Sequence, residues 1–380
     1  MISPKDFVTY LESKNFHFYT GVPCSYFKSV IEFIKDWNRS SYYIAPNEGS
    51  ALALASGASL SGNPAVVMIQ NSGLGNLINP LTSLSMIYEL PVLIFVTGRA
   101  YGISDEPQHE IMGRTMGKLL DAIGILHWDL PTEGNAFQGI LDTGIQEAKK
   151  RNVPVVFFVA KGTFGPYASC ESQPKSEYSM KRIDAIKEIA QSLCERDLVF
   201  STTGKISREL FSVYDRKNNF YMQGSMGHIG SLALGAALSH PDRSVIVLDG
   251  DGAFLMHLGA VSTIGHYQPE HFYHLVLDNE AYETTGNQDT TSSTVDFEMI
   301  AKACGYRMTR KVAEVSELRN TLRDFFTQKG PALLHIKVNR IETKDIPRIT
   351  TRYSAPQISR SFHESVRPTH SAQVGGTLDE

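Results

Sequence analysis

Two short apolar runs between residues 244 and 279 constrain the fold more than any other part of the chain. The runs 244–248 (SVIVL) and 272–277 (FYHLVL) are rich in β-branched and aromatic residues, which predicts two buried strands. Residues 253–265, between them, predict a helix. A strand, a helix and a second strand in this order form a right-handed crossover, in which the strands are parallel and their C-terminal ends lie side by side.

A polar turn follows each of these strands. The first strand runs into DGDG at 249–252, where glycine lets the backbone approach a ligand closely, and the second ends in Asp-Asn at 278–279. We therefore expect Asp251 and Asn279 to meet at one edge of the sheet. A carboxylate and an amide oxygen suit Mg²⁺, so a diphosphate bridged by this ion near a helix N-terminus is the expected guest. A plain strand-ending turn with Asp as helix cap also explains DGDG, but it gives the spaced Asn279 no role.

Length and composition describe an ordinary globular protein. The chain has 380 residues, which suggests two domains, and a net charge of −4, which gives no reason to expect nucleic-acid binding. No run approaches the roughly 18 apolar residues of a transmembrane helix, and residues 1–15 do not resemble a secretory signal. Four cysteines without C-x-x-C spacing fit free thiols in a reducing cytoplasm, the expected location.

Strand-like and helix-like segments alternate along most of the chain. This rhythm predicts an α/β fold of two doubly wound domains, each with a parallel sheet covered by helices on both faces. A Gly- and Pro-containing stretch without periodicity interrupts the alternation and predicts a linker. We expect domains at 1–165 and 181–345, a linker at 166–180 and a C-terminal tail at 346–380.

Several motifs resemble those of thiamine-diphosphate-dependent enzymes. A GDG turn followed by a spaced Asn resembles the cofactor signature of this superfamily. The resemblance implies a pyrimidine-binding domain followed by a diphosphate-binding domain. Four further motifs narrow the resemblance: TGVPCS (20–25), QNSGLGNLINPLTSL (70–84), DEPQHEIMG (105–113) and STTGKISREL (201–210). Together with the GDG stretch, they resemble the phosphonopyruvate decarboxylase family.

The resemblance implies two cofactors, thiamine diphosphate and Mg²⁺, held by the second domain. The implied metal ligands are Asp251, Asn279 and the backbone carbonyl of Ala281. Met226 would be the bulky apolar support of the cofactor, although a lone Met is commonly core filler. The other residues expected to contact the cofactor are Thr203, Gly204, Gly224, Ser225, Gly250, Gly252 and Ala253, together with Asn279 and Ala281.

Glu48 is the candidate catalytic carboxylate of the first domain. It follows a predicted strand and opens a predicted helix. The resemblance implies that it shares a proton with N1′ of the aminopyrimidine, a task for which apolar surroundings would raise its pKa. A plain first-turn acid favoured by the helix dipole is the alternative. Since the superfamily joins the two domain types across subunits, a homo-oligomer with inter-subunit active sites is also implied.

The family that the chain resembles converts 3-phosphonopyruvate to phosphonoacetaldehyde and CO₂ in phosphonate biosynthesis. A phosphonate requires donors, and the candidates are Ser25, Asn71 and His109, of which His109 is also a catalytic candidate. Weaker substrate candidates, more commonly solvated surface charges, are Arg99 and Lys118. Residues expected near the thiazolium are His228, Thr285 and Asn287.

Three other functions stay open at this point. A sulfopyruvate decarboxylase has the same chemistry and differs in the charge of the 3-substituent, and a carboligase would join the same intermediate to another carbonyl compound. A non-catalytic thiamine-diphosphate-binding protein is disfavoured because Glu48, Asp251 and Asn279 occur together. We expect a small-molecule 2-oxoacid substrate and no nucleic-acid or membrane partner.

Overall fold

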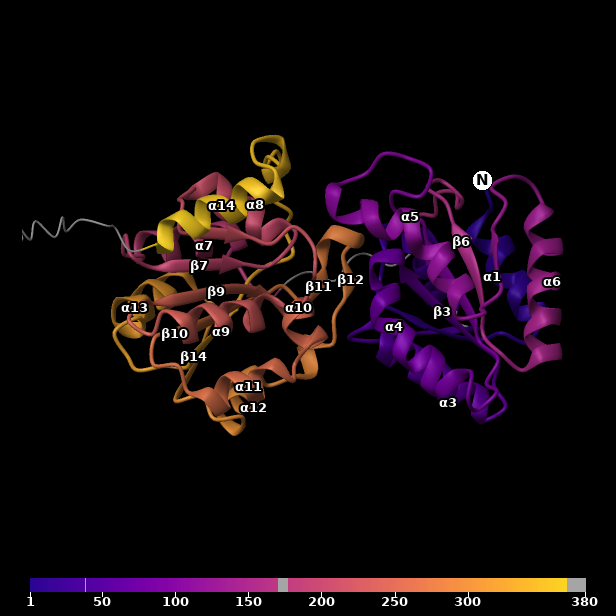
Figure 1. The fold of residues 1–380 in the computed structure, drawn as a ribbon, viewed down its shortest axis with the longest axis horizontal. Coiled ribbons are helices and arrows are strands. Elements are labelled where there is room, and N and C mark those ends of the chain that lie inside the picture. The colour runs from indigo at the N-terminus through magenta and orange to yellow at the C-terminus, as the bar shows by residue number, and fades with distance from the viewer. Residues whose placement is uncertain (38, 170–176, 368–380) are drawn as a thin grey trace, which may run out of the picture.

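The computed structural model describes residues 1–37, 39–169 and 177–367, which form two α/β domains side by side (Figure 1). The first domain ends with strand β6 (Val155–Val159), and helix α7 (Arg182–Gln191) begins the second. The expected linker lies between these elements, and its residues 170–176 lie outside the described residues.

The first domain is built on a sheet whose strand pairs are all parallel. In the described chain the sheet has six strands in the order β2-β1-β3-β4-β6-β5. Its central strands are continuous apolar runs because helices cover both faces. The other strands are β1 (Phe18–Gly21), β2 (Ser41–Ile44), β3 (Ala65–Gln70), β4 (Leu93–Thr97) and β5 (His127–Asp129). The helical segments are α1 (Pro4–Ser13), η1 (Ser25–Phe27), α2 (Lys28–Trp37), α3 (Glu48–Leu60), η2 (Asn71–Gly73), α4 (Leu74–Pro80), η3 (Leu81–Ser85), α5 (Pro107–Ala122) and α6 (Ala136–Arg151).

The second domain repeats this topology. Among the described residues its main sheet also has six parallel strands, in the order β13-β14-β10-β9-β7-β8, which is the order of the first sheet read from the other edge. The strands are β7 (Leu198–Ser201), β8 (Asn219–Tyr221), β9 (Val245–Gly250), β10 (Phe272–Asp278), β13 (Met308–Val312) and β14 (Ala332–Lys337), with a small hairpin of β11 (Ala281–Tyr282) and β12 (Gln288–Asp289). The helical segments are α8 (Lys205–Val213), α9 (Ile229–Ser239), α10 (Asp251–Met256), α11 (Ala260–Tyr267), η4 (Glu283–Thr285), η5 (Ser292–Thr294), α12 (Phe297–Ala303), α13 (Val315–Phe325), η6 (Ile349–Thr351) and α14 (Ala355–Val366). The prediction of two doubly wound α/β domains is confirmed.

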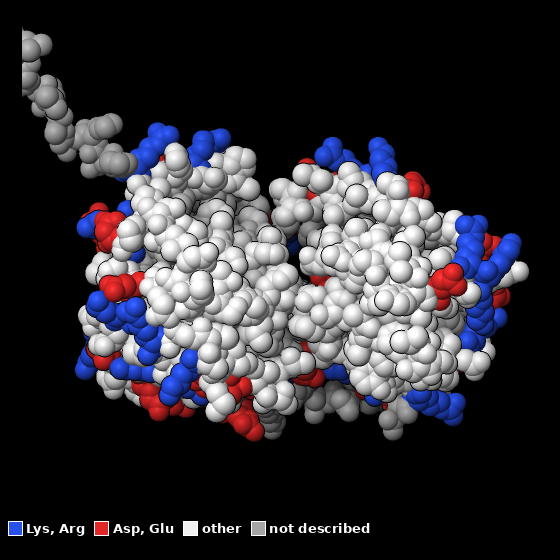
Figure 2. Space-filling view, turned by 60° about the horizontal axis from the view of Figure 1, so that its bottom comes forward, with Lys and Arg blue, Asp and Glu red and all other residues white. Residues whose placement is uncertain are grey.

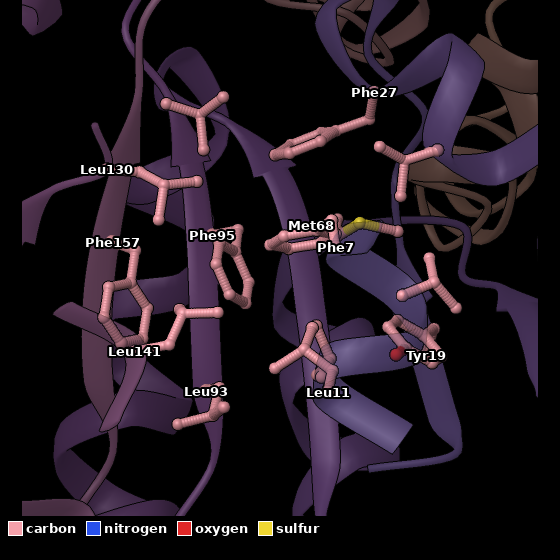
Figure 3. Packing of buried hydrophobic residues seen from close by; sticks show 14 of the residues in the cluster. Phe7, Leu11, Tyr19, Phe27, Met68, Leu93, Phe95, Leu130, Leu141 and Phe157 are labelled. Atoms are coloured by element: carbon pink, nitrogen blue, oxygen red, sulfur yellow. The ribbon is translucent and has the colours of Figure 1, made fainter. Parts of the chain in front are cut away.

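Each sheet has its own apolar core on both faces. In the first domain, the ring of Phe95 meets Phe7 edge to face at 5.2 Å and stacks on Phe157 at 5.0 Å, as Figure 3 shows. Val67 and Ile94 belong to a second cluster of buried residues in the same domain. Because each domain buries its own core, the domains do not need to pack tightly against each other, and a ligand site can form between them. Within the described residues, no helix combines the length and the apolar character that a membrane span requires.

The structure differs from the expected secondary structure in three places. Strands β5 and β13 were not predicted, because they lie at sheet edges and their sequences, HWD and MTRKV, have no apolar run. The single helix expected over 253–265 is wrong: α10 ends at Met256, the next residue His257 has a φ of −131°, and α11 begins at Ala260.

The expected C-terminal tail contains two helical segments up to residue 367. Segment η6 packs against α8, and α14 packs against β8. The ring of Phe362 in α14 contacts Phe200 of β7 at 4.9 Å. The tail therefore covers the second domain, and η6 reaches the space between the domains.

Candidate active site

A cavity of about 700 Å³ lies between the two domains. Its walls contain the loops that follow β1 and β3 in the first domain and β7 in the second. In each sheet the first and third strands flank the point where the strand order reverses, and ligands of doubly wound sheets bind outside this point. The volume suits a cofactor with its substrate. Figure 2 shows the cleft between the domains from one side.

Contacts between the domains hold the cavity together. The Nδ2 of Asn47 donates a hydrogen bond to the backbone oxygen of Met256 at 3.3 Å, and Lys35 pairs with Asp289 at 3.1 Å. Met256 is the last residue of α10, so its carbonyl is free to accept this bond. In this structure, the facing domains belong to one chain.

Glu48 lies in the cavity wall at the start of α3. Asn47 caps this helix by accepting a hydrogen bond from Ser50 N, and this fixes the position of Glu48. Glu48 is only 5% exposed, and burial raises the pKa of its carboxyl. Asn76 donates to its Oε2 at 2.8 Å. Gly73 makes room for the carboxylate, since a Cβ there would lie 2.0 Å from Glu48 Oε1. A buried, protonatable carboxyl with one donor fits a proton-sharing role at a nitrogen base.

Two glycine-containing turns of the second domain face Glu48 across the cavity. Gly204 has φ +93° and begins α8, and Thr203 donates to the backbone oxygen of Gln223 at 2.9 Å. Both Thr203 and Gly204 line the cavity, which exposes the N-terminus of α8 to an anion. The predicted residues Gly224, Ser225 and Met226 line the cavity as well.

The Gly224 loop has a backbone suited to presenting a side chain. Ser225 has φ +52° and Gly227 has φ +85°, so the residue between them stands on a sharply turned segment. That residue is Met226, which is half-buried at the cavity wall, not in a core cluster. This placement fits an apolar support for a bound cofactor.

The two predicted metal-binding segments lie next to each other. Strands β9 and β10 pair with Gly250 opposite Leu277, so Asp251 and Asn279 follow neighbouring strand ends. Asp251 is buried at the start of α10, and Thr290 donates to its Oδ2 at 2.5 Å. The Oδ1 of Asn279 accepts from Ala281 N at 3.2 Å.

The electrostatics of Asp251 fit a cation site. No Lys, Arg or His among the described residues forms an ion pair with Asp251, and burial and the charge of Asp278 raise its pKa to about 7. Burial would raise the pKa of Asp278 as well, but hydrogen bonds from His335 and Lys337 lower it, so this neighbour stays ionised. A divalent cation would neutralise the charge of this buried carboxylate. The clamp residues Gly250, Asp251, Gly252, Ala253, Asn279 and Ala281 lie behind the cavity wall, not in it.

The candidate substrate residues do not all reach the cavity. Ser25, at the start of η1, and His109, in the first turn of α5, line it. Asn71 does not: it is fully buried, and its Nδ2 donates to the backbone oxygen of Arg99 at 2.7 Å. Asn71 therefore supports the wall, and its predicted substrate contact does not agree with this placement. Lys118 is exposed on α5 away from the cavity.

The environment of His109 makes it a neutral donor or acceptor. Its Nδ1 lies 3.4 Å from Asp105 Oδ1, and its Nε2 lies 3.5 Å from Gln70 Nε2. Burial and the charge of Arg99 lower the pKa of His109. Arg99 in turn donates to both oxygens of Asp105 and holds the pKa of this carboxyl at about 2.

Of the residues expected near the thiazolium, His228 and Thr285 line the cavity and Asn287 does not.

Sequence reasoning missed several residues of the cavity. Arg348 and Thr350, from η6 and the residue before it, both bond to Glu106 at the start of α5 and so join the two domains over the cavity. Arg208 lines the cavity from α8. Arg208 lies within the STTGKISREL motif, which was the available signal, whereas nothing in the polar sequence after residue 340 marks Arg348.

Comparisons with known proteins identify the family of the chain. Residues 4–120 match the family described as thiamine pyrophosphate enzyme, N-terminal TPP binding domain, and residues 202–336 match its C-terminal TPP binding domain. Thiamine pyrophosphate is thiamine diphosphate. A phosphonopyruvate decarboxylase of Streptomyces hygroscopicus is 34% identical over 99% of this chain and 97% of its own length. One of Streptomyces viridochromogenes is 36% identical over 89% of both chains, and a sulfopyruvate decarboxylase of Methanosarcina acetivorans is 27% identical over 91% of this chain and 92% of its own. The chain therefore belongs to the phosphonopyruvate decarboxylase family and is a thiamine-diphosphate-dependent decarboxylase.

Proposed function

We propose that this enzyme decarboxylates 3-phosphonopyruvate to phosphonoacetaldehyde and CO₂, with thiamine diphosphate and Mg²⁺ bound between its domains. The observation that carries the proposal is the cavity, in which Glu48 of the first domain faces the Thr203–Gly204 turn and Met226 of the second. Two relatives that bear the name phosphonopyruvate decarboxylase, at 34% and 36% identity, support the substrate. The reaction would serve phosphonate biosynthesis in a reducing cytoplasm.

Each part of the cavity has a role in this proposal. Bound thiamine diphosphate supplies a thiazolium that accepts the electrons released when CO₂ leaves. Glu48 holds a proton at N1′ of the aminopyrimidine, because burial raises the pKa of its carboxyl and so favours the protonated form. The N-terminus of α8 binds the diphosphate, Met226 supports the ring system, and His109 and Ser25 hold the substrate.

We assign the metal to Asp251, Asn279 and the backbone oxygen of Ala281. The supporting observation is the buried Asp251 carboxylate, which lacks a basic partner among the described residues and whose pKa is raised to about 7. Mg²⁺ binds few protein oxygens and completes its shell with phosphate oxygens and water. The metal would therefore tie the diphosphate to the ends of β9 and β10.

Sulfopyruvate is the second candidate substrate. The observation in its favour is the Methanosarcina acetivorans sulfopyruvate decarboxylase, which matches nearly the whole chain at 27% identity. The sulfonate group of sulfopyruvate is a monoanion, whereas the phosphonate group of 3-phosphonopyruvate is largely a dianion at neutral pH. We favour phosphonate because the two phosphonopyruvate decarboxylases are more similar to this chain than the Methanosarcina acetivorans sulfopyruvate decarboxylase is.

Release of CO₂ from a panel of 3-substituted pyruvates tests the proposal. Purified protein is assayed with 3-phosphonopyruvate, sulfopyruvate and pyruvate, with and without thiamine diphosphate and Mg²⁺. We expect turnover to require both cofactors and kcat/KM to be highest for 3-phosphonopyruvate, by roughly 10²-fold or more over pyruvate. A preference for sulfopyruvate contradicts the substrate assignment, and a carboligation product in place of the aldehyde contradicts the reaction.

We also propose that the enzyme is a homo-oligomer whose active sites are shared between subunits. The middle of the face that carries α3, α11 and α12 has almost no charged side chains, which gather at its margins, as Figure 2 shows. These helices carry exposed Leu54, Leu60, Tyr267 and Met299. An uncharged face with exposed apolar residues is typical of a permanent interface. The contact seen here between the two domain types would then form between neighbouring chains.

A further inference from the structure

Among the described residues, three arginines line the cavity, and two of them pair with carboxylates. Arg99 donates to both oxygens of Asp105, and Arg348 pairs with Glu106. Arg208 is different: within the part of the chain that the structure describes, no carboxylate forms an ion pair or side-chain hydrogen bond with it. The cavity therefore contains one uncompensated guanidinium.

Arg208 is fixed in place by its helix. It lies one turn after Gly204 on α8, whose neighbours Ile206 and Ser207 are buried. Segment η6 packs against the same helix, so Arg208 shares the cavity wall with Arg348, Ile349 and Thr350. The side chain is partly buried, and this burial lowers the pKa of the guanidinium.

A partly desolvated cation without a counter-ion is costly for a protein. Such a cation in a ligand cavity indicates an anionic group as its missing partner, and a guanidinium matches a phosphoryl-type group with two parallel hydrogen bonds. Two guests of this cavity carry such a group: the diphosphate of the cofactor and the phosphonate of the substrate.

The other charges of the site favour the phosphonate. The diphosphate has Mg²⁺ at Asp251 and the N-terminus of α8 as its positive partners in our assignment. The substrate has no comparable partner, because Ser25 is neutral and burial lowers the pKa of His109. A phosphonate dianion would therefore enter a cavity in which Arg208 is the available cation among the described residues.

We propose that Arg208 binds the phosphonate of the substrate and determines the preference of the enzyme for an anionic 3-substituent. This inference rests on the proposed function, since it takes 3-phosphonopyruvate as the substrate. It adds a residue of the second domain to a substrate site otherwise formed by Ser25 and His109 of the first.

The test compares Arg208→Met, Arg208→Gln and Arg208→Lys with the wild type. The control is Arg243→Met. Arg243 is also partly buried, and burial lowers its pKa, but it lies before the N-terminal end of β9, whereas the cavity lies at the C-terminal ends of the strands. For each protein kcat/KM is measured with 3-phosphonopyruvate and with pyruvate, and thiamine-diphosphate affinity is measured by calorimetry with Mg²⁺. We expect Arg208→Met and Arg208→Gln to lower kcat/KM for 3-phosphonopyruvate by roughly 10²-fold or more. Turnover of pyruvate and cofactor affinity should stay near the wild-type values, with Arg208→Lys between the two and Arg243→Met unchanged.

Two results would overturn the inference. An equal loss on both substrates, or a loss of thiamine-diphosphate affinity, would place Arg208 at the diphosphate. If the wild type prefers sulfopyruvate, the proposed function fails, and the same ratio is then measured with sulfopyruvate against pyruvate. A selective loss on sulfopyruvate supports Arg208 as the anion-binding residue, and an equal loss on both contradicts it.

Discussion

Glu48→Gln separates the chemistry of the site from its structure. The change removes one ionisable proton and keeps the size of the side chain. Asn76 donates to Glu48 Oε2 at 2.8 Å, and a glutamine can present its amide oxygen to the same donor. One neutral hydrogen bond replaces one to a carboxyl group, so the structural cost is about 1 kcal/mol or less.

The expected loss of activity is much larger. A positioned proton donor and acceptor contributes typically 10²–10⁴-fold to a rate, and an amide cannot take the part of the carboxyl. We therefore expect kcat to fall by roughly 10²- to 10⁴-fold at saturating thiamine diphosphate. Exchange of the C2 hydrogen of the bound cofactor for deuterium, followed by quenched-flow NMR, should slow in parallel. Glu110→Gln, at an exposed position of α5 outside the cavity, is the matched control.

The stability of Glu48→Gln relative to the wild type should increase as the pH rises. Burial raises the pKa of Glu48 above its unfolded value, so the folded protein keeps a proton that the unfolded chain releases. The wild type thus loses stability as pH rises from the unfolded pKa through the folded pKa, whereas glutamine does not titrate. Urea unfolding of the cofactor-free proteins should show a difference in favour of Glu48→Gln that grows with pH and then levels off. Normal turnover, or a difference that shrinks with pH, would refute the role and environment given to Glu48.

Further predictions concern the metal, the substrate and the subunits. Asp251→Ala should lower thiamine-diphosphate affinity strongly in calorimetry with Mg²⁺, because it removes the charged ligand of the metal. Unchanged affinity would disprove the assignment of the metal to Asp251. His109→Ala should lower kcat/KM for 3-phosphonopyruvate far more than for pyruvate, and an equal loss would give His109 a general role. Coexpressed Glu48→Gln and Asp251→Ala chains should regain activity that neither has alone, because a shared site restores one intact pair; mixed oligomers without activity would mean that one chain builds the whole site.

The fold was predictable where the sequence is buried. Strands β9 and β10 carry continuous apolar runs, and the polar turns that follow them located Asp251 and Asn279 at neighbouring strand ends. Strand β13 was not predictable because its sequence MTRKV lies at a sheet edge and is only partly buried. The end of α10 at Met256 was also missed, because the apolar pattern of the sequence continues past this residue although the helical backbone does not.

The site was predictable where a single strand end or turn forms it. Glu48 and the Gly224 loop lie where their positions after strands placed them. Asn71 is not among the residues that line the cavity, although its turn is adjacent to it, because its Nδ2 bonds to the backbone of Arg99. Arg348 could not be found, because it becomes part of the wall only when η6 meets Glu106 of the other domain. Contacts between domains leave no periodic trace in a sequence.

A crystal structure of the protein with thiamine diphosphate and Mg²⁺ would show directly whether the two domains hold the cofactor between them. We expect the cofactor in the cavity between the domains, with a Glu48 oxygen within hydrogen-bond distance of the aminopyrimidine N1′. We also expect the metal between Asp251, Asn279 and the diphosphate. A cofactor bound elsewhere, or an aminopyrimidine that does not contact Glu48, would contradict this assignment.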